Sequence, residues 1–192
     1  MKKVGVLALQ GDFEAHGKAL KRLGARPSLA RSAQDLEELD GLVIPGGEST
    51  TMWKLLDAEN MRGALVNFGK TRPIFGTCAG AILIASEVTN PPQQSLGLID
   101  IGVERNGYGR QIDSRVAHLD PAPEFQQRTH AGELEAVFIR APIIRRAGPN
   151  AKVLATYQGD PVLVEQGRHL AATFHPELTA DSRVHELFLR KL

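Results

Sequence analysis

Cys78 is the only cysteine of the chain, and it lies two residues after Gly76 and two residues before Gly80. The apolar residues 74–75 are typical of the end of a short buried strand, and the alanine-rich run 79–86 is typical of the start of a buried helix. Glycines at a strand-to-helix turn allow close backbone approach, and the helix dipole favours the reactive thiolate. The spacing therefore indicates a nucleophile, although free cysteines usually behave as small buried hydrophobes.

A cysteine nucleophile needs a base that moves its proton, and the base needs a group that orients it. His175 follows the apolar run 169–174, at the end of an expected buried strand, and Glu177 comes two residues later. The carboxylate is therefore within reach of the imidazole, where it would fix the tautomer of the ring. The other histidines are more typical of satisfied core or surface positions, and no further ligands near His175 favour a metal. Cys78, His175 and Glu177 thus form a candidate triad.

The loop at residues 46–48 contains two adjacent glycines and follows the apolar run 40–44. A glycine-rich loop that leads into a helix offers free backbone N–H groups to an anion. Phosphate is a poor fit, because no lysine follows with the P-loop spacing and Glu48 would repel it. A plain turn capped by a hydroxyl of residues 49–50 would explain the hydroxyls but not both glycines. We therefore expect the loop N–H groups to face an oxyanion beside Cys78.

These candidate residues need a scaffold in which the ends of several strands meet. Strand-like and helix-like segments alternate in the first half of the chain, with strands at 4–9, 27–30 and 40–44 and helices at 13–23 and 52–68. The second helix is expected to be interrupted or weakened near Gly63. This alternation predicts an α/β fold with a doubly wound, mostly parallel central sheet flanked by helices. Ligands of such sheets bind beyond the carboxyl ends of the strands, where the candidate residues lie.

The second half of the chain has a different pattern. Apolar runs separated by hairpin-length connections predict additional antiparallel strands at 134–139, 153–156 and 161–164. A last strand is expected at 169–174 and a final helix at 182–191. Residues 120–132 are expected to form a long surface excursion.

The composition favours a single domain over residues 1–192, large enough to bury a substantial core. The net charge of +1 does not indicate nucleic acid or an anionic membrane as a partner. One cysteine excludes an internal disulfide, no signal peptide precedes the first expected strand, and no apolar run has the length of a membrane span. We therefore expect a cytoplasmic protein that does not bind membranes.

Two motifs resemble those of class I (triad-type) glutamine amidotransferases, namely Gly76-Thr77-Cys78-Ala79-Gly80 and the late His175-Pro176-Glu177. Further segments narrow the resemblance to the PdxT family, the glutaminase subunits of the ribose-5-phosphate-dependent pyridoxal 5′-phosphate synthase. These segments are residues 5–11, 45–51, 105–106 with 108–111, and 138–142. The resemblance runs nearly end to end and is weakest between residues 114 and 133, so it predicts nothing about that segment.

The resemblance implies a flavodoxin-like fold and an enzyme that hydrolyses L-glutamine to L-glutamate and ammonia through a thioester on Cys78, without a cofactor. It implies that His175 is the base and acid and that Glu177 orients it. The implied glutamine-binding residues are Gly46, Gly47, Glu48, Arg105, Ile139 and Arg140. Gln10 and His16 correspond to residues near a partner contact.

The implied partner is a PdxS-like synthase subunit, bound in a hetero-oligomer. It would use the ammonia to make pyridoxal 5′-phosphate from ribose 5-phosphate and glyceraldehyde 3-phosphate. Two other interpretations are compatible with the elbow alone. A cysteine hydrolase or peptidase on a similar α/β sheet would not require Arg105 or the Ile139–Arg140 edge, and a non-catalytic binding module would contain an inert buried cysteine.

Overall fold

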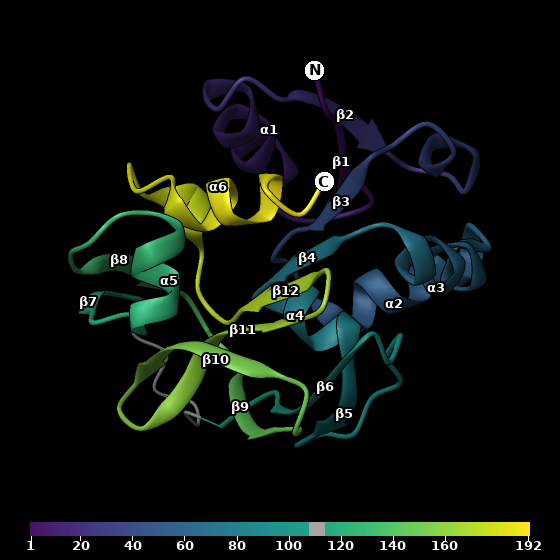
Figure 1. The fold of residues 1–192 in the computed structure, drawn as a ribbon. Helices are drawn as coiled ribbons and strands as arrows, with labels where there is room; N and C mark the ends of the chain where they lie inside the picture. Colours follow the sequence, from purple (N-terminus) through teal and green to yellow (C-terminus); the bar gives the residue numbers. More distant parts are fainter. Residues whose placement is uncertain (108–113) are drawn as a thin grey trace.

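The central sheet has seven strands among residues 1–107 and 114–192, which the computed structural model describes. These strands are β1 (Lys3–Leu7), β2 (Arg26–Ala30), β3 (Gly41–Ile44), β4 (Ile74–Thr77), β10 (Lys152–Tyr157), β11 (Asp160–Gln166) and β12 (His169–Ala172). Their order across the sheet is β10-β11-β12-β4-β3-β1-β2 (Figure 1).

The five strands from β12 to β2 run parallel, whereas β11 is antiparallel to both β10 and β12. The chain adds β2 on one side of β1, and then β3, β4 and β12 on the other side. The strand order therefore reverses beside β1, and ligands of doubly wound sheets bind beyond the carboxyl ends of the strands at such a point. The predicted mostly parallel sheet with antiparallel strands in the C-terminal half is confirmed.

Both faces of the sheet are apolar, because successive residues of a strand point to opposite sides. In β3, Leu42 and Ile44 pack into the core on one face and Val43 into the core on the other, and all three are fully buried. The helices on the first face are α2 (Ser49–Ala58), α3 (Met61–Thr71) and α4 (Ala79–Ile84), and those on the second are α1 (Phe13–Arg22) and α6 (Arg183–Leu189) (Figure 1). This double covering explains the continuous apolar runs of the sequence.

The segment expected as one helix at 52–68 forms two helices, α2 and α3. The chain turns at Asn60, whose φ of 53° lies in the left-handed region that asparagine tolerates better than most residues. The expected interruption near Gly63 thus occurs at Asn60, and Gly63 itself lies inside α3. None of the described helices has the length and hydropathy needed to cross a membrane.

The remaining strands form two smaller sheets. One contains β5 (Ala85–Thr89), β6 (Ile99–Glu104) and β9 (Ile143–Ala147), and the other contains β7 (Arg115–Leu119) and β8 (Leu134–Phe138). The helix expected at 79–86 is shorter than predicted, because α4 ends at Ile84 and β5 begins at the next residue.

The segment expected as a surface excursion at 120–132 is partly a core element. It contains α5 (Pro123–Arg128), whose Phe125 is fully buried in the core of the second face. The guanidinium of Arg183, itself almost fully buried, lies over the Phe125 ring and donates to the backbone carbonyl of Gly132 at 2.9 Å. A single aromatic residue among polar neighbours produces no periodic pattern, which is why this anchor is not visible in the sequence.

Candidate active site

Cys78 lies at the turn between β4 and α4, and its backbone is strained. Its φ of 48° and ψ of −109° fall outside the regions that L residues favour, a conformation that costs about 1–3 kcal/mol and clusters at functional sites. A side chain on Gly76 would overlap the carbonyl of Gly80, and one on Gly80 would overlap the carbonyl of Ile44. Both glycines are therefore needed to bring the elbow against the end of β3.

His175 and Glu177 lie beside this thiol, beyond the end of β12. His175 Nδ1 is 2.7 Å from Glu177 Oε1, and the Glu177 side chain is completely buried in the 3-10 turn η2 (Pro176–Leu178). The ring of His175 also hydrogen bonds to Cys78. The parallel pairing of β12 with β4 brings these residues together from distant parts of the chain. The three residues of the predicted triad thus form one contiguous cluster.

The protonation of His175 follows from these contacts. Burial alone would lower its pKa, but the hydrogen bonds and charges of Cys78 and Glu177 outweigh burial and raise the pKa to about 10. The ring is therefore held as an imidazolium at neutral pH, and this form can protonate a leaving amine. On the other side of the site, Cys78 Sγ lies 3.7 Å from the carbonyl oxygen of Ile139.

Three further side chains lie buried behind Glu177, namely His16 from α1, Thr77 from β4 and His185 from α6. His16 Nε2 is 3.3 Å from Glu177 Oε2 and 3.1 Å from Thr77 Oγ1. His16 Nδ1 is 3.0 Å from His185 Nε2. The His16 side chain has no exposed surface, so it cannot itself touch a partner, and its place near a partner contact stays a prediction.

The loop between β3 and α2 is held by Glu48 and Gln10. The Glu48 carboxylate accepts hydrogen bonds from the backbone N–H groups of Thr50 and Thr51, at 3.1 and 2.7 Å, and so caps α2. The cap of α2 is therefore Glu48, and not a hydroxyl of Ser49 or Thr50 as in the alternative of a plain capped turn. Partial burial would raise the pKa of Glu48, but the hydrogen bonds from the two threonines outweigh it and lower the pKa to about 2. Gln10 Oε1 accepts the Glu48 N–H at 2.9 Å, so the loop is tied to the end of β1 as well.

Four of the expected glutamine-binding residues, Gly46, Gly47, Ile139 and Arg140, line a cavity of about 320 Å³. Cys78 and His175 line the same cavity, which is completed by Gly11, Asp12 and Leu178. The carboxyl ends of β1, β3, β4 and β12 therefore converge on one site, as the sequence predicts for their turns.

Glu48 and Arg105, the other two expected glutamine-binding residues, lie outside this lining and beside each other. Arg105 Nη2 is 3.4 Å from Glu48 Oε1 and 3.0 Å from Thr50 Oγ1. The pair thus lies at the N-terminus of α2, next to the loop rather than in the cavity. The motif at residues 108–111 lies outside the described residues.

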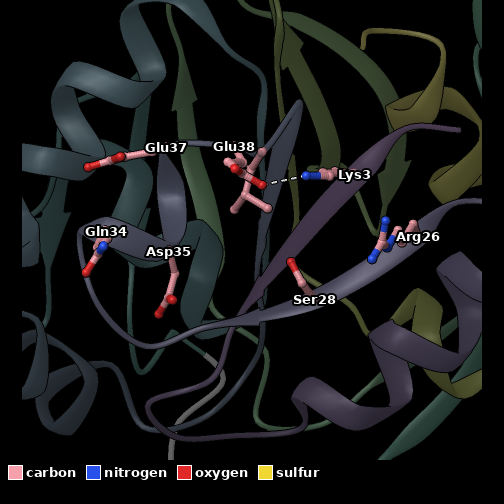
Figure 2. Close-up of a pocket in the computed structure, with 8 residues that line it drawn as sticks. Lys3, Arg26, Ser28, Gln34, Asp35, Glu37 and Glu38 are labelled. Carbon is pink, nitrogen blue, oxygen red and sulfur yellow. Dashed lines mark hydrogen bonds and ion pairs between the residues drawn. The ribbon is translucent and has the colours of Figure 1, made fainter.

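A second cavity, of about 390 Å³, lies at the opposite ends of β1 and β2 (Figure 2). Lys3 at the start of β1 pairs with Glu38, with 2.6 Å between Nζ and Oε2, and Arg26 and Asp35 lie near them. The described residues that line this cavity include both signs of charge but no cysteine or histidine. It lacks the thiol and the imidazole of the predicted triad, which line the cavity at the carboxyl ends of the strands.

Acid will destabilise the fold through buried histidines. Burial lowers the pKa of His185 and of His169 to about 4, whereas an unfolded chain titrates near 6.5. Below about pH 6.5 the unfolded chain binds protons that the folded chain does not, so each such histidine removes up to about 1.4 kcal/mol of stability per pH unit towards pH 4. We expect urea midpoints to fall between about pH 6 and pH 4.5, with a smaller slope for His169→Gln. The exposed His118→Gln should keep the wild-type slope, and equal slopes for both variants would contradict the prediction.

The raised pKa of His175 acts in the opposite sense, because the folded chain holds that proton more tightly than the unfolded chain. Its contribution is complete below about pH 6.5 and is lost as the pH rises towards 10. The urea midpoints between about pH 6 and pH 4.5 are therefore measured below the pH range in which the contribution of His175 changes.

Cys78, His175 and Glu177 lie together beyond the carboxyl ends of β4 and β12, beside the glycine-rich loop that follows β3. The fold and this site together define a triad-type glutamine amidotransferase. The chain belongs to the SNO glutamine amidotransferase family, whose model matches residues 6–192.

Relatives of this family match the chain over almost their whole length. The chain is 65% identical to the pyridoxal 5′-phosphate synthase subunit PdxT of Solibacter usitatus (strain Ellin6076), with 100% of both chains covered. It is 54% identical to the subunit of the same name from Koribacter versatilis (strain Ellin345), covering 98% of this chain and 94% of the relative. A solved structure described as a glutamine amidotransferase has a TM-score of 0.89 at 45% identity, covering 98% of this chain and 97% of the other.

The sequence analysis did not single out His185, Thr77 or Leu178. The sequence does indicate that His16 is buried, because His16 shares one helical face with Phe13 and Leu20 at spacings of three and four residues. His185 likewise lies among apolar residues of the final helix. Their approach to Glu177 depends on the packing of α1 and α6, which no local pattern indicates.

Proposed function

We propose that this chain, as one domain over residues 1–192, is the glutaminase subunit of a pyridoxal 5′-phosphate synthase. It hydrolyses L-glutamine to L-glutamate and ammonia and supplies the ammonia to a synthase subunit. That subunit makes pyridoxal 5′-phosphate from ribose 5-phosphate and glyceraldehyde 3-phosphate. The observation that carries the proposal is the contact of Cys78, His175 and Glu177 at one cavity, in a chain that is 65% identical to a PdxT subunit.

The first half of the reaction forms a thioester. The Cys78 thiolate attacks the side-chain carbonyl carbon of glutamine, and the carbonyl oxygen becomes an oxyanion. The first N–H groups of α4 lack acceptors within the helix, and with N–H groups of the Gly46-Gly47 loop they are suited to binding this charge. The His175 imidazolium then protonates the departing nitrogen, ammonia leaves, and the γ-glutamyl group remains on sulfur.

The second half of the reaction regenerates the thiolate. Neutral His175 takes a proton from a water molecule, whose oxygen attacks the thioester carbon. Collapse of the second tetrahedral intermediate breaks the carbon–sulfur bond and releases glutamate. Glu177 accepts the Nδ1–H of His175 throughout and so holds the ring with Nε2 towards the reacting atoms.

We assign the remaining contacts of glutamine to the rim of the cavity. Ile139 and Arg140 form the edge opposite the loop, and the carbonyl oxygen of Ile139 already lies close to the thiol. The Arg105 guanidinium, at the N-terminus of α2, is the cation proposed to bind the α-carboxylate of glutamine. Binding there would require the substrate to extend from the cavity past Glu48.

Removing the Arg105 guanidinium will weaken the binding of glutamine more than it slows the chemical steps. Hydrogen bonds to charged groups contribute about 1.5–3 kcal/mol, so Arg105→Ala should raise KM by about tenfold to a hundredfold with a much smaller change in kcat. Arg146→Ala is the matched control, since Arg146 pairs with Asp100 far from the loop. Steady-state kinetics of both variants with the synthase subunit check the prediction. An unchanged KM for Arg105→Ala would remove this residue from the substrate site.

The synthase subunit is proposed to dock at the mouth of this cavity, in a hetero-oligomer. Leu178 lines the cavity and is 44% exposed, so it presents an apolar side chain at the mouth. A partner that covered it would exclude water and keep ammonia inside the assembly. Gln10 is partly exposed at the same edge and holds the Glu48 N–H, so docking there can adjust the loop. A cytoplasmic location stays a prediction from the sequence.

The test is reconstitution with the synthase subunit, ribose 5-phosphate and glyceraldehyde 3-phosphate. Glutamine should support formation of pyridoxal 5′-phosphate and be converted to glutamate in equal amount, at a higher rate than in the isolated chain. Product formed from an ammonium salt but not from glutamine would overturn the proposal. Cleavage of a peptide library would support a peptidase instead. Slow, pH-insensitive labelling of Cys78 by an electrophilic glutamine analogue, even in the complex, would support an inert binding module.

A further inference from the structure

Two buried histidines extend the triad on the side away from the substrate. His16 has no exposed surface and His185 is 1% exposed. They lie in line behind Glu177, with 3.3 Å between Glu177 Oε2 and His16 Nε2 and 3.0 Å between His16 Nδ1 and His185 Nε2. The mechanism described above uses neither ring. Burying two imidazoles in contact with a carboxylate is costly unless their polar atoms are paired.

Both rings are neutral at neutral pH. Burial, followed by the nearby His185 and His175, lowers the pKa of His16 well below its ordinary value. Burial, followed by the charge of Arg22, lowers the pKa of His185 to about 4. A neutral imidazole has one N–H donor and one acceptor nitrogen. The position of the proton on His16 therefore decides what this ring presents to Glu177.

The surroundings of His16 select the tautomer with the proton on Nε2. Glu177 Oε2 is buried without a well-aligned hydrogen bond among the described residues, and His16 Nε2 faces it at 3.3 Å. A lone pair on Nε2 would repel the lone pairs of Glu177 Oε2, whereas an N–H there is attracted to them. Nδ1 is then the acceptor, so His185 donates its Nε2–H across the 3.0 Å contact.

The same Nε2–H also faces the elbow. Thr77 Oγ1 lies 3.1 Å from His16 Nε2, and Thr77 is the residue directly before Cys78. The His16 Nε2–H is therefore shared between Thr77, at the end of the strand that precedes Cys78, and the carboxylate of Glu177. Because α1 supplies this donor, the relative placement of the two halves of the triad depends on a third element of the fold.

We propose that His16 is a positioning residue of the triad: its Nε2–H, fixed by His185, holds the Glu177 carboxylate with Oε1 towards His175 and ties it to Thr77 at the elbow. The proposal rests on the glutaminase function proposed above. Without this donor, Glu177 Oε2 loses its 3.3 Å contact with a polar N–H in the interior, and the carboxylate gains freedom to rotate away from His175. Removing the His16 donor therefore slows proton transfer by His175 and leaves substrate binding unchanged.

The kinetic test uses three variants in the reconstituted complex. His16→Leu removes the donor at similar volume and should lower kcat about tenfold while KM stays within about twofold. His16→Gln retains an N–H donor and should recover most of the loss. Leu20→Ala is the matched control, because Leu20 is a fully buried apolar residue one turn further along the same face of α1. Equal kcat losses for His16→Leu and Leu20→Ala would reduce His16 to a packing residue and overturn the proposal.

A second measurement requires no turnover. The Nδ1–H of His175, in its 2.7 Å hydrogen bond to Glu177, should give a downfield proton resonance in histidine-labelled protein. This resonance should shift upfield or broaden in His16→Leu and be unchanged in Leu20→Ala. If the wild type hydrolyses no glutamine but the resonance still moves, the glutaminase proposal fails while the positioning role holds. An unmoved resonance with wild-type kcat would overturn the positioning role.

A variant that preserves ring packing protects the test against misfolding. His185 contacts the Phe75 ring edge to face, so His185→Phe should keep an aromatic ring in place while removing the donor to His16. Without this donor the tautomer of His16 is no longer fixed. The His185→Phe substitution should therefore lower kcat about threefold and move the His175 resonance in the same direction as His16→Leu. A folded His185→Phe protein with an unmoved resonance and unchanged kcat would show that the His16 tautomer does not matter.

Discussion

Replacing Cys78 with alanine will lower glutamine hydrolysis by more than about 10³-fold, because no other group among the described residues of the cavity can form the thioester. The methyl side chain would keep the elbow but leave the His175 imidazolium without a nucleophile to serve. The variant loses the thiol contacts to His175 and Ile139 that help to hold the strained φ of 48°, so a modest loss of stability should accompany the loss of activity. The rate of glutamate release in the complex measures the effect.

An ammonium salt provides the control for this variant. If the substituted chain still assembles with the synthase subunit, external ammonia should support formation of pyridoxal 5′-phosphate at the wild-type rate. Loss of the glutamine-dependent rate alone would then assign Cys78 to ammonia production. Glutaminase activity within about tenfold of wild type would mean that the reaction does not pass through this sulfur.

Gly46→Ala will have the next largest effect, a fall in kcat of about 10²-fold or more. A Cβ at this position would lie 2.6 Å from His175 Cε1 and 3.4 Å from Cys78 Cβ, so either the loop or the imidazole must shift. A shifted loop moves the backbone N–H groups proposed to bind the oxyanion, and losing one such donor typically costs about 10²–10³-fold. A shifted ring breaks the alignment of His175 with the thiol.

Gly63→Ala is the matched control, because a Cβ on this helical glycine meets open space. It should leave kcat and KM unchanged and raise the free energy of unfolding by roughly 0.5–1 kcal/mol, since alanine favours the helix. Steady-state kinetics and urea unfolding of both variants check the pair. A Gly46→Ala enzyme with wild-type kcat would show that the loop does not form the oxyanion site in its present conformation.

The meeting of the candidate triad could be predicted from the sequence because each residue follows an apolar run. Cys78 and His175 each come at the carboxyl end of a buried strand, and parallel strands place those ends along one edge of the sheet. The Gly46-Gly47 loop follows a third such strand. No contact distance was needed to expect these three turns to converge.

Other features depend on geometry that a local pattern does not contain. The positive φ of Cys78 has no sequence signal, because glycine is the residue that normally indicates it. Capping by Glu48 requires its carboxylate to reach two N–H groups, which the loop conformation decides. The break between α2 and α3 falls at Asn60 and not at Gly63, since a helix tolerates an interior glycine more easily than a left-handed residue.

The pairing of β12 with β4 at the centre of the sheet also bears on biosynthesis. β4 leaves the ribosome early, but the strand that completes its parallel ladder, and the base that follows it, belong to the last part of the chain. Contacts between such distant segments form late, after the cost of closing the long intervening loop has been met. A chain that has emerged only as far as β4 therefore lacks the residue proposed to activate its thiol, and it should release no ammonia until β12 and His175 have followed and folded.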